Sequence, residues 1–173
     1  MALAEAYSAT STKTYLNDAI SLMKSALLRY APNNILQDDC DTKGCQTGAL
    51  SFKLVLILGL KDLYRQADPA TQTIIMTVIQ KSIQGMAPTC DASYNCKRTW
   101  QVDGAATTSG FDAEMIALAL VTTAVSIVAP KLGMITQTSP TTVKVASSGL
   151  RHISFIHTSR ICAWTALSLL ALL

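Results

Sequence analysis

Apolar side chains recur at spacings of three and four over four stretches of the chain, which predicts four amphipathic helices. They cover residues 12–30, 49–66, 69–85 and 111–128, and residues 2–8 have the composition of the end of a further helix. The predicted buried face of the first of the four is Tyr15, Leu16, Ala19, Ile20, Leu22, Met23, Ala26, Leu27 and Tyr30. The predicted buried set of 69–85 is Ile74, Ile75, Val78, Ile79 and Ile83.

Polar residues, proline and glycine mark the expected ends of these helices. Ser11 or Thr12 is placed to cap the helix over 12–30. Asp68 is placed to cap the helix that starts at Pro69, and Gly85 is expected to stop it. These signals set the boundaries of the predicted elements.

The second helix contains a run, Leu54 to Leu58, that is apolar at every position. A short buried strand is an alternative for these five residues, but the length of the whole segment favours a helix. A helix that is apolar all round needs burial on both sides. We therefore expect this helix to be covered from two directions.

No strand alternation or hairpin signal interrupts the helical segments, so the predicted fold class is all-α. The four helices either close a small bundle or form part of a larger helical toroid. With 173 residues, half of them hydrophobic, the chain has the size of one ordered domain. Its net charge of +3 is too weak for the clustered basic face that nucleic acid requires.

The chain divides by composition into a helical body over 1–130, a Ser/Thr-rich linker over 131–150, and a C-terminal segment over 151–173. No window of membrane-spanning length is both free of charge and strongly apolar. The N-terminus shows no basic and apolar stretch of a secretion signal.

The C-terminal segment has the order of features found in a glycosylphosphatidylinositol signal. Small residues that include Ser147 and Ser148 precede a spacer, Leu150 to Arg160, and an uncharged apolar tail, Ile161 to Leu173. Ser147 and Ser148 are the candidate attachment residues, and their use would tether the chain to a membrane. The alternative is an amphipathic helix without such a role.

Four of the five cysteines lie as two close pairs in polar loops, Cys40 with Cys45 and Cys90 with Cys96. Two local disulfides are favoured, which suits an oxidising compartment. A four-cysteine zinc site is the alternative, although the spacing of the second pair is long for it. Cys162, in the apolar tail, accounts for the odd number.

Candidate chemistry in the body is sparse. Asp38 and Asp39 are an adjacent carboxylate pair, which could serve glycoside hydrolysis or simply face solvent in an acidic loop. Lys53 could point into a sugar site or lie along its helix end, and Trp100 could stack on a sugar ring or act as a buried anchor. No metal or cofactor site is predicted.

Several segments together resemble glycoside hydrolase family 76, the endo-α-1,6-mannanase family, in its fungal, cell-wall members that are anchored through glycosylphosphatidylinositol. The carriers are ALAEAYSATSTKTYLNDAISLMKSAL, APNNILQDDCDTKGCQTGALSFK, LYRQADPATQTIIMTVIQKS, CDASYNCKRTW and SGFDAEMIALALV. The Cys-loop followed by Ser51, Phe52 and Lys53 is the most specific of them.

The resemblance implies the later hairpins of an incomplete (α/α)6 toroid and a mannose-containing glycan as partner. It also implies a place at the outer face of the plasma membrane or in the cell wall. The family's catalytic pair is two adjacent aspartates on an inner helix upstream of the matched region, so Asp38 and Asp39 do not take that role and no catalytic residue is assigned. Asp39, Phe52, Lys53 and Trp100 are the candidate substrate contacts, and the chain alone is expected to be inactive.

Three motif positions differ from the family pattern. Gly48 stands where an acidic residue is usual, the run Leu54 to Leu58 replaces a small residue and an arginine, and Ala113 to Met115 replaces Glu-Gln-Met. These differences weaken the case for sugar binding even where the scaffold is kept. A small disulfide-stapled helical domain with a binding or structural role at the cell surface is therefore the alternative function.

Overall fold

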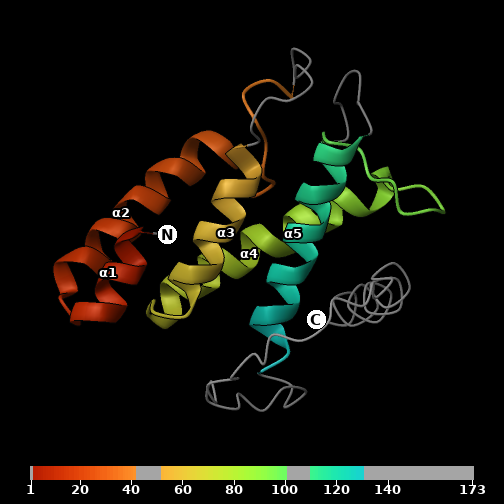
Figure 1. Cartoon of the computed structure of the whole chain (residues 1–173). Helices are drawn as coiled ribbons and strands as arrows, with labels where there is room; N and C mark the ends of the chain where they lie inside the picture. Colours follow the sequence, from red (N-terminus) through yellow and green to blue (C-terminus); the bar gives the residue numbers. More distant parts are fainter. Residues whose placement is uncertain (1, 42–51, 101–109, 131–173) are drawn as a thin grey trace, which may run out of the picture. The chain divides into compact units, whose positions relative to one another are not determined.

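The computed structural model describes residues 2–41, 52–100 and 110–130, and these are the residues considered below (Figure 1). The chain divides into two units, Met1–Ile127 and Val128–Leu173, and the second lies almost wholly outside the described residues. The described helices are α1 (Ala2–Thr10), α2 (Lys13–Tyr30), α3 (Phe52–Tyr64), α4 (Pro69–Met86), the short 3-10 helix η1 (Ala87–Thr89) and α5 (Phe111–Val128), and all but the last residue of α5 belong to the first unit.

The fold class is all-α, as the sequence predicts, and the described ranges contain no strand. Four helices match the predicted segments within three residues at each end, and α1 is the further helix expected near the N-terminus. The run Leu54 to Leu58 lies inside α3 and is helical, which removes the strand alternative. The predicted linker and C-terminal segment, beyond residue 130, fall outside the described residues.

The start of α4 is set by the predicted side-chain cap. Oδ1 of Asp68 accepts hydrogen bonds from the backbone N–H groups of Ala70 and Thr71 at 2.9 and 3.0 Å, and Pro69 is the first helical residue. These hydrogen bonds hold the pKa of Asp68 below its ordinary value, and the bond from Thr71 contributes most. At α2, Thr12 occupies the predicted cap position, but its side chain makes no capping hydrogen bond.

Gly85 does not end α4, contrary to prediction, since the helix continues to Met86. The residue is needed for close packing instead. A Cβ built at position 85 would lie 2.6 Å from the backbone carbonyl oxygen of Trp100, which is closer than two such atoms can approach. The glycine therefore lets the Trp100 segment lie directly against the helix.

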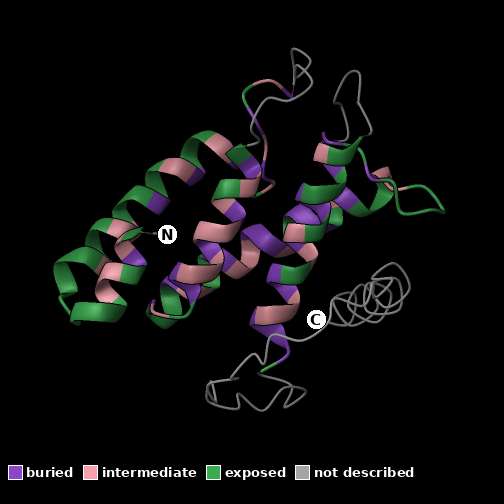
Figure 2. Cartoon of the chain, in the orientation of Figure 1, coloured by how far each residue is buried: buried purple, intermediate pink, exposed green. Residues whose placement is uncertain are grey.

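The core of the first unit is built mainly by α3, α4 and α5. Helix α1 packs on α2, α2 on α3, and α3 on α4. Buried residues lie mainly along one face of each of these helices (Figure 2). The main ones are Ile57, Leu60, Leu63, Ile75, Val78, Ile79, Ile83, Ile116 and Leu120. Trp100, in the segment that follows η1, is buried as well. Truncating one such aliphatic residue to alanine typically costs about 2–5 kcal/mol.

Several predicted core positions are exposed. Only Met23 and Leu27 are buried on α2, whereas Leu22 is 65% exposed. Ile74 lies at the edge of the buried face of α4, with 38% exposure. Helix α3 is not covered from two directions, because Val55 is 53% exposed. Periodicity located each helix, but the width of its buried face depends on neighbours that periodicity does not specify.

Helix α5 is the one described helix that is long and apolar enough to cross a membrane, judged by length and composition. No membrane-spanning segment is predicted from the sequence. Core helices of soluble proteins meet the same criterion, and one face of α5 is enclosed in the first unit. Its enclosed residues are Ala113, Ile116, Ala117, Leu120, Thr123, Ala124 and Ile127. We therefore describe α5 as a core helix.

Candidate functional site

The candidate residues lie around a loop, residues 36–41, that follows α2 and is fixed at its start by two hydrogen bonds. The backbone N–H of Leu36 donates to the buried hydroxyl of Ser82 on α4 at 2.9 Å. The backbone N–H of Gln37 donates to the carbonyl oxygen of Tyr30, the last residue of α2, at 2.8 Å. Hydrogen bonds to α2 and α4 thus fix the start of the loop, and its three aspartates follow.

Two of these aspartates belong to a buried ionic cluster at the start of α3. Nζ of Lys53 lies 2.7 Å from Oδ2 of Asp41 and also donates to the carbonyl oxygen of Arg98. Oδ1 of Asp38 accepts from the backbone N–H of Lys53 at 2.9 Å, and its Oδ2 lies 3.3 Å from Nη2 of Arg98. Nζ of Lys53 also lies 4.7 Å from the ring centroid of Trp100.

The cluster is enclosed and joins three segments that are distant in sequence. The Lys53 side chain is fully inaccessible, and that of Asp41 is 4% exposed. Burial lowers the pKa of Lys53, and the nearby Asp41 carboxylate opposes that shift. Because a buried charge is costly without partners, the two carboxylates and the carbonyl are what make an internal lysine tolerable here.

The structure brings together two predicted substrate contacts, Lys53 and Trp100, but it places both inside the fold. Each residue is 1% exposed. Their role as sugar contacts stays a prediction, and the geometry favours an internal structural role for both. Sequence reasoning missed Arg98, whose charge and carbonyl both serve the cluster, because it lies 45 positions from Lys53 and 60 from Asp38.

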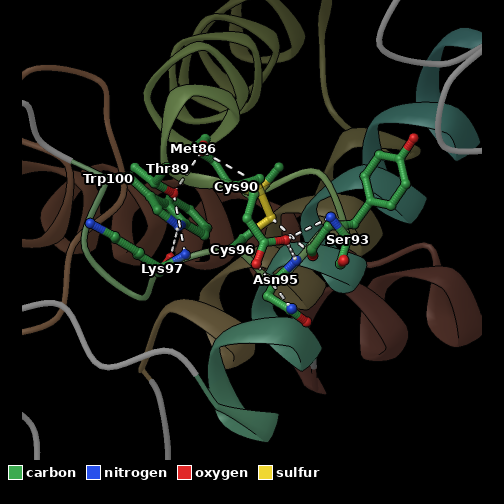
Figure 3. The surroundings of a disulfide bond; sticks show 10 residues. Met86, Thr89, Cys90, Ser93, Asn95, Cys96, Lys97 and Trp100 are labelled. Atoms are coloured by element: carbon green, nitrogen blue, oxygen red, sulfur yellow. Dashed lines mark hydrogen bonds between the residues drawn. A yellow bond between two sulfur atoms is a disulfide. The ribbon is translucent and has the colours of Figure 1, made fainter.

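The loop that carries Trp100 is held by a disulfide between Cys90 and Cys96, with an S–S distance of 2.04 Å (Figure 3). Inside this loop, Oδ1 of Asp91 accepts from the backbone N–H groups of Ser93 and Asn95. Nε1 of Trp100 donates to the carbonyl oxygen of Lys97 at 3.0 Å. The loop therefore has an internal framework that positions the buried indole.

This disulfide also bears on the zinc alternative. Because Cys90 and Cys96 are bonded to each other, they do not offer the thiolates that zinc requires. Cys40 is disulfide-bonded as well, while its predicted partner Cys45 lies outside the described residues. Ser147 and Ser148, the candidate anchor residues, also lie outside them.

The other two predicted contacts, Asp39 and Phe52, lie at the surface with two residues from the end of α2. The rings of Tyr30 and Phe52 are stacked, with centroids 4.5 Å apart and planes inclined by 24°. The guanidinium of Arg29 lies 5.4 Å from the centroid of Tyr30 and binds Asp39 through two hydrogen bonds of 2.7 and 3.4 Å. We name Arg29, Tyr30, Asp39 and Phe52 the aromatic–ionic surface.

The adjacent carboxylates Asp38 and Asp39 do not form a catalytic pair. A retaining glycosidase needs two carboxyl groups about 5–5.5 Å apart, on either side of one scissile bond. Asp38 is buried against Arg98, whereas the side chain of Asp39 is 60% exposed and bound to Arg29. One carboxylate is therefore committed to the interior and the other to the surface.

The sequence matches the family model described as glycosyl hydrolase family 76 over residues 1–133. No curated protein and no solved structure matches the chain. The matched range contains every described helix, the buried ionic cluster and the aromatic–ionic surface. On this match over most of its length, the chain belongs to glycosyl hydrolase family 76.

Proposed function

We propose that this chain binds α-1,6-linked mannose chains as part of a protein of the endo-α-1,6-mannanase type. The observation that carries the proposal is the family match over residues 1–133, which makes a glycan the natural ligand class. The resemblance of the Cys-loop and of Ser51 to Lys53 to fungal members of the family supports mannose as the sugar.

We further propose that this chain binds glycan without cleaving it. The adjacent aspartates of the chain are Asp38 and Asp39, and their carboxylates serve different partners. In a retaining mechanism one aspartate attacks the anomeric carbon while the other protonates the leaving oxygen, so both must face the same bond. We therefore propose that the chain forms part of the wall of a glycan-binding cleft. Hydrolysis or transglycosylation would then depend on an aspartate pair other than Asp38 and Asp39.

The proposed location is the outer face of the plasma membrane or the cell wall. The disulfide between Cys90 and Cys96 supports an oxidising compartment. The order of small residues, spacer and apolar tail around Ser147 and Ser148 supports attachment through glycosylphosphatidylinositol.

The test is to incubate the full chain with α-1,6-mannooligosaccharides and to measure binding by calorimetry and cleavage by the release of reducing ends. Cellooligosaccharides, which are β-1,4-linked, are the control ligand. The proposal predicts selective binding to the mannose series and no cleavage. Cleavage that disappears in Asp38→Asn or Asp39→Asn would overturn the non-catalytic assignment. Absence of mannooligosaccharide binding would overturn the glycan assignment and favour the alternative, a disulfide-stapled structural domain.

A further inference from the structure

The aromatic–ionic surface is held in place by the backbone around it. Its residues come from three segments, which are the end of α2, the loop over 36–41 and the first residue of α3. The hydrogen bond from Gln37 N–H to the Tyr30 carbonyl joins the first two segments. The hydrogen bond from Lys53 N–H to Asp38 joins the loop to α3. A ligand would meet an arrangement formed in advance, which limits the entropy lost on binding.

Much of this surface faces solvent although it is partly apolar. Phe52 is 50% exposed while one side of its ring is stacked on Tyr30. The side chains of Arg29 and Asp39 are 66% and 60% exposed. The surface thus combines an open aromatic ring with a hydrogen-bonded pair of charges, and Tyr30 contacts both Phe52 and Arg29.

These features suit a neutral sugar. A pyranose has one face of C–H groups and an edge of hydroxyl groups. The electron-rich face of an aromatic ring attracts the C–H groups. The Arg29–Asp39 pair offers both donors and acceptors to such an edge. An anionic ligand is disfavoured, because the carboxylate of Asp39 already engages the guanidinium of Arg29 and cancels its charge.

We propose that the aromatic–ionic surface is a glycan-stacking subsite, in which Phe52 stacks on a mannose ring and the Arg29–Asp39 pair hydrogen-bonds hydroxyl groups of the same glycan chain. The inference rests on the proposed function for the class of ligand. It adds Arg29 and Tyr30 to the predicted contacts and separates Asp39 and Phe52 from the buried pair, Lys53 and Trp100.

The test compares matched variants of the full chain in the same mannooligosaccharide titration. Phe52→Ala is expected to weaken binding about tenfold, because the stacking contact is lost. Phe111→Ala is its control, since Phe111 is also the first residue of a helix and is 75% exposed. Arg29→Gln is paired in the same way with Arg65→Gln, a second exposed arginine. Phe52→Tyr, which keeps the ring, is expected to restore binding.

Circular dichroism of each variant shows whether the helices are retained, so that a loss of binding is assigned to the surface and not to unfolding. The inference is supported if Phe52→Ala and Arg29→Gln lose affinity while their controls do not. Wild-type binding that both variants keep would overturn the subsite and leave the proposed function intact. Absence of wild-type binding would instead refute the proposed function and, with it, this subsite.

Discussion

Replacing Lys53 with methionine tests whether the buried ionic cluster holds the first unit together. Methionine has a side chain of similar length and also favours the helix, but it lacks the ammonium group. Asp41 then loses its ion-pair contact at 2.7 Å, and the Arg98 carbonyl oxygen loses a donor. The Asp41 carboxylate stays buried, because its side chain is 4% exposed.

The expected cost follows from that enclosure. Removing one partner of a buried ion pair typically destabilises a protein by about 3–5 kcal/mol, because the remaining charge is left poorly compensated. Since single domains unfold with about 5–15 kcal/mol, this is a large share of the total. Adding Asp41→Asn removes the buried negative charge, so the double variant is expected to cost less than the sum of the single variants.

Urea unfolding followed by circular dichroism measures these differences. With a denaturant dependence of about 2 kcal/mol per molar urea, Lys53→Met is expected to lower the midpoint by about 1.5–2.5 M. Lys81→Met on α4 is the control, because Lys81 is exposed. Equal midpoints for Lys53→Met and Lys81→Met would refute the reasoning, as would strict additivity of Lys53→Met with Asp41→Asn.

Three further predictions concern the scaffold. Gly85→Ala should destabilise the chain by about 1–3 kcal/mol in the same urea assay, because the added Cβ would lie 2.6 Å from the Trp100 carbonyl oxygen. A Gly→Ala change inside a helix usually stabilises it, so a gain of stability would contradict the close packing. Cys90→Ser should cost about 2 kcal/mol by opening a short loop, measured as a lower thermal midpoint, and an unchanged midpoint would contradict it. The lowered pKa of Asp68 means that the unfolded chain binds protons more readily, so this carboxylate stabilises the fold above its ordinary pKa near 3.8 and that contribution is lost as pH falls below it. Asp68→Asn should therefore flatten the acid limb of a stability–pH curve, and an unchanged limb would refute the stabilising role of this carboxylate charge.

The helices could be predicted from the sequence because their signals are local. Spacings of three and four located α2 to α5, and Asp68 with Pro69 fixed the start of α4 from adjacent residues. The role of Gly85 could not be found in this way, since it depends on the Trp100 carbonyl, which approaches from another segment. The exposure of Val55 likewise depends on which neighbours cover α3.

The sequence indicates the individual candidate residues, but it does not indicate which of them lie together in the fold. Asp39 and Phe52 fell on one surface, whereas Lys53 and Trp100 met inside the fold. A lysine at the start of an apolar helix carries no local sign of whether it is buried, because that depends on distant acceptors such as the carbonyl of Arg98. Pairs far apart in sequence were therefore beyond prediction from the sequence pattern.

Our main proposal is that the chain binds glycan without cleaving it, as part of a family 76 protein. The most direct measurement is calorimetric titration of the full chain with α-1,6-mannooligosaccharides, combined with analysis of the ligand afterwards for cleavage. We expect saturable binding that Phe52→Ala weakens and Phe111→Ala leaves unchanged, with every oligosaccharide recovered intact. Titration without saturable binding, or recovery of shortened oligosaccharides, would contradict it.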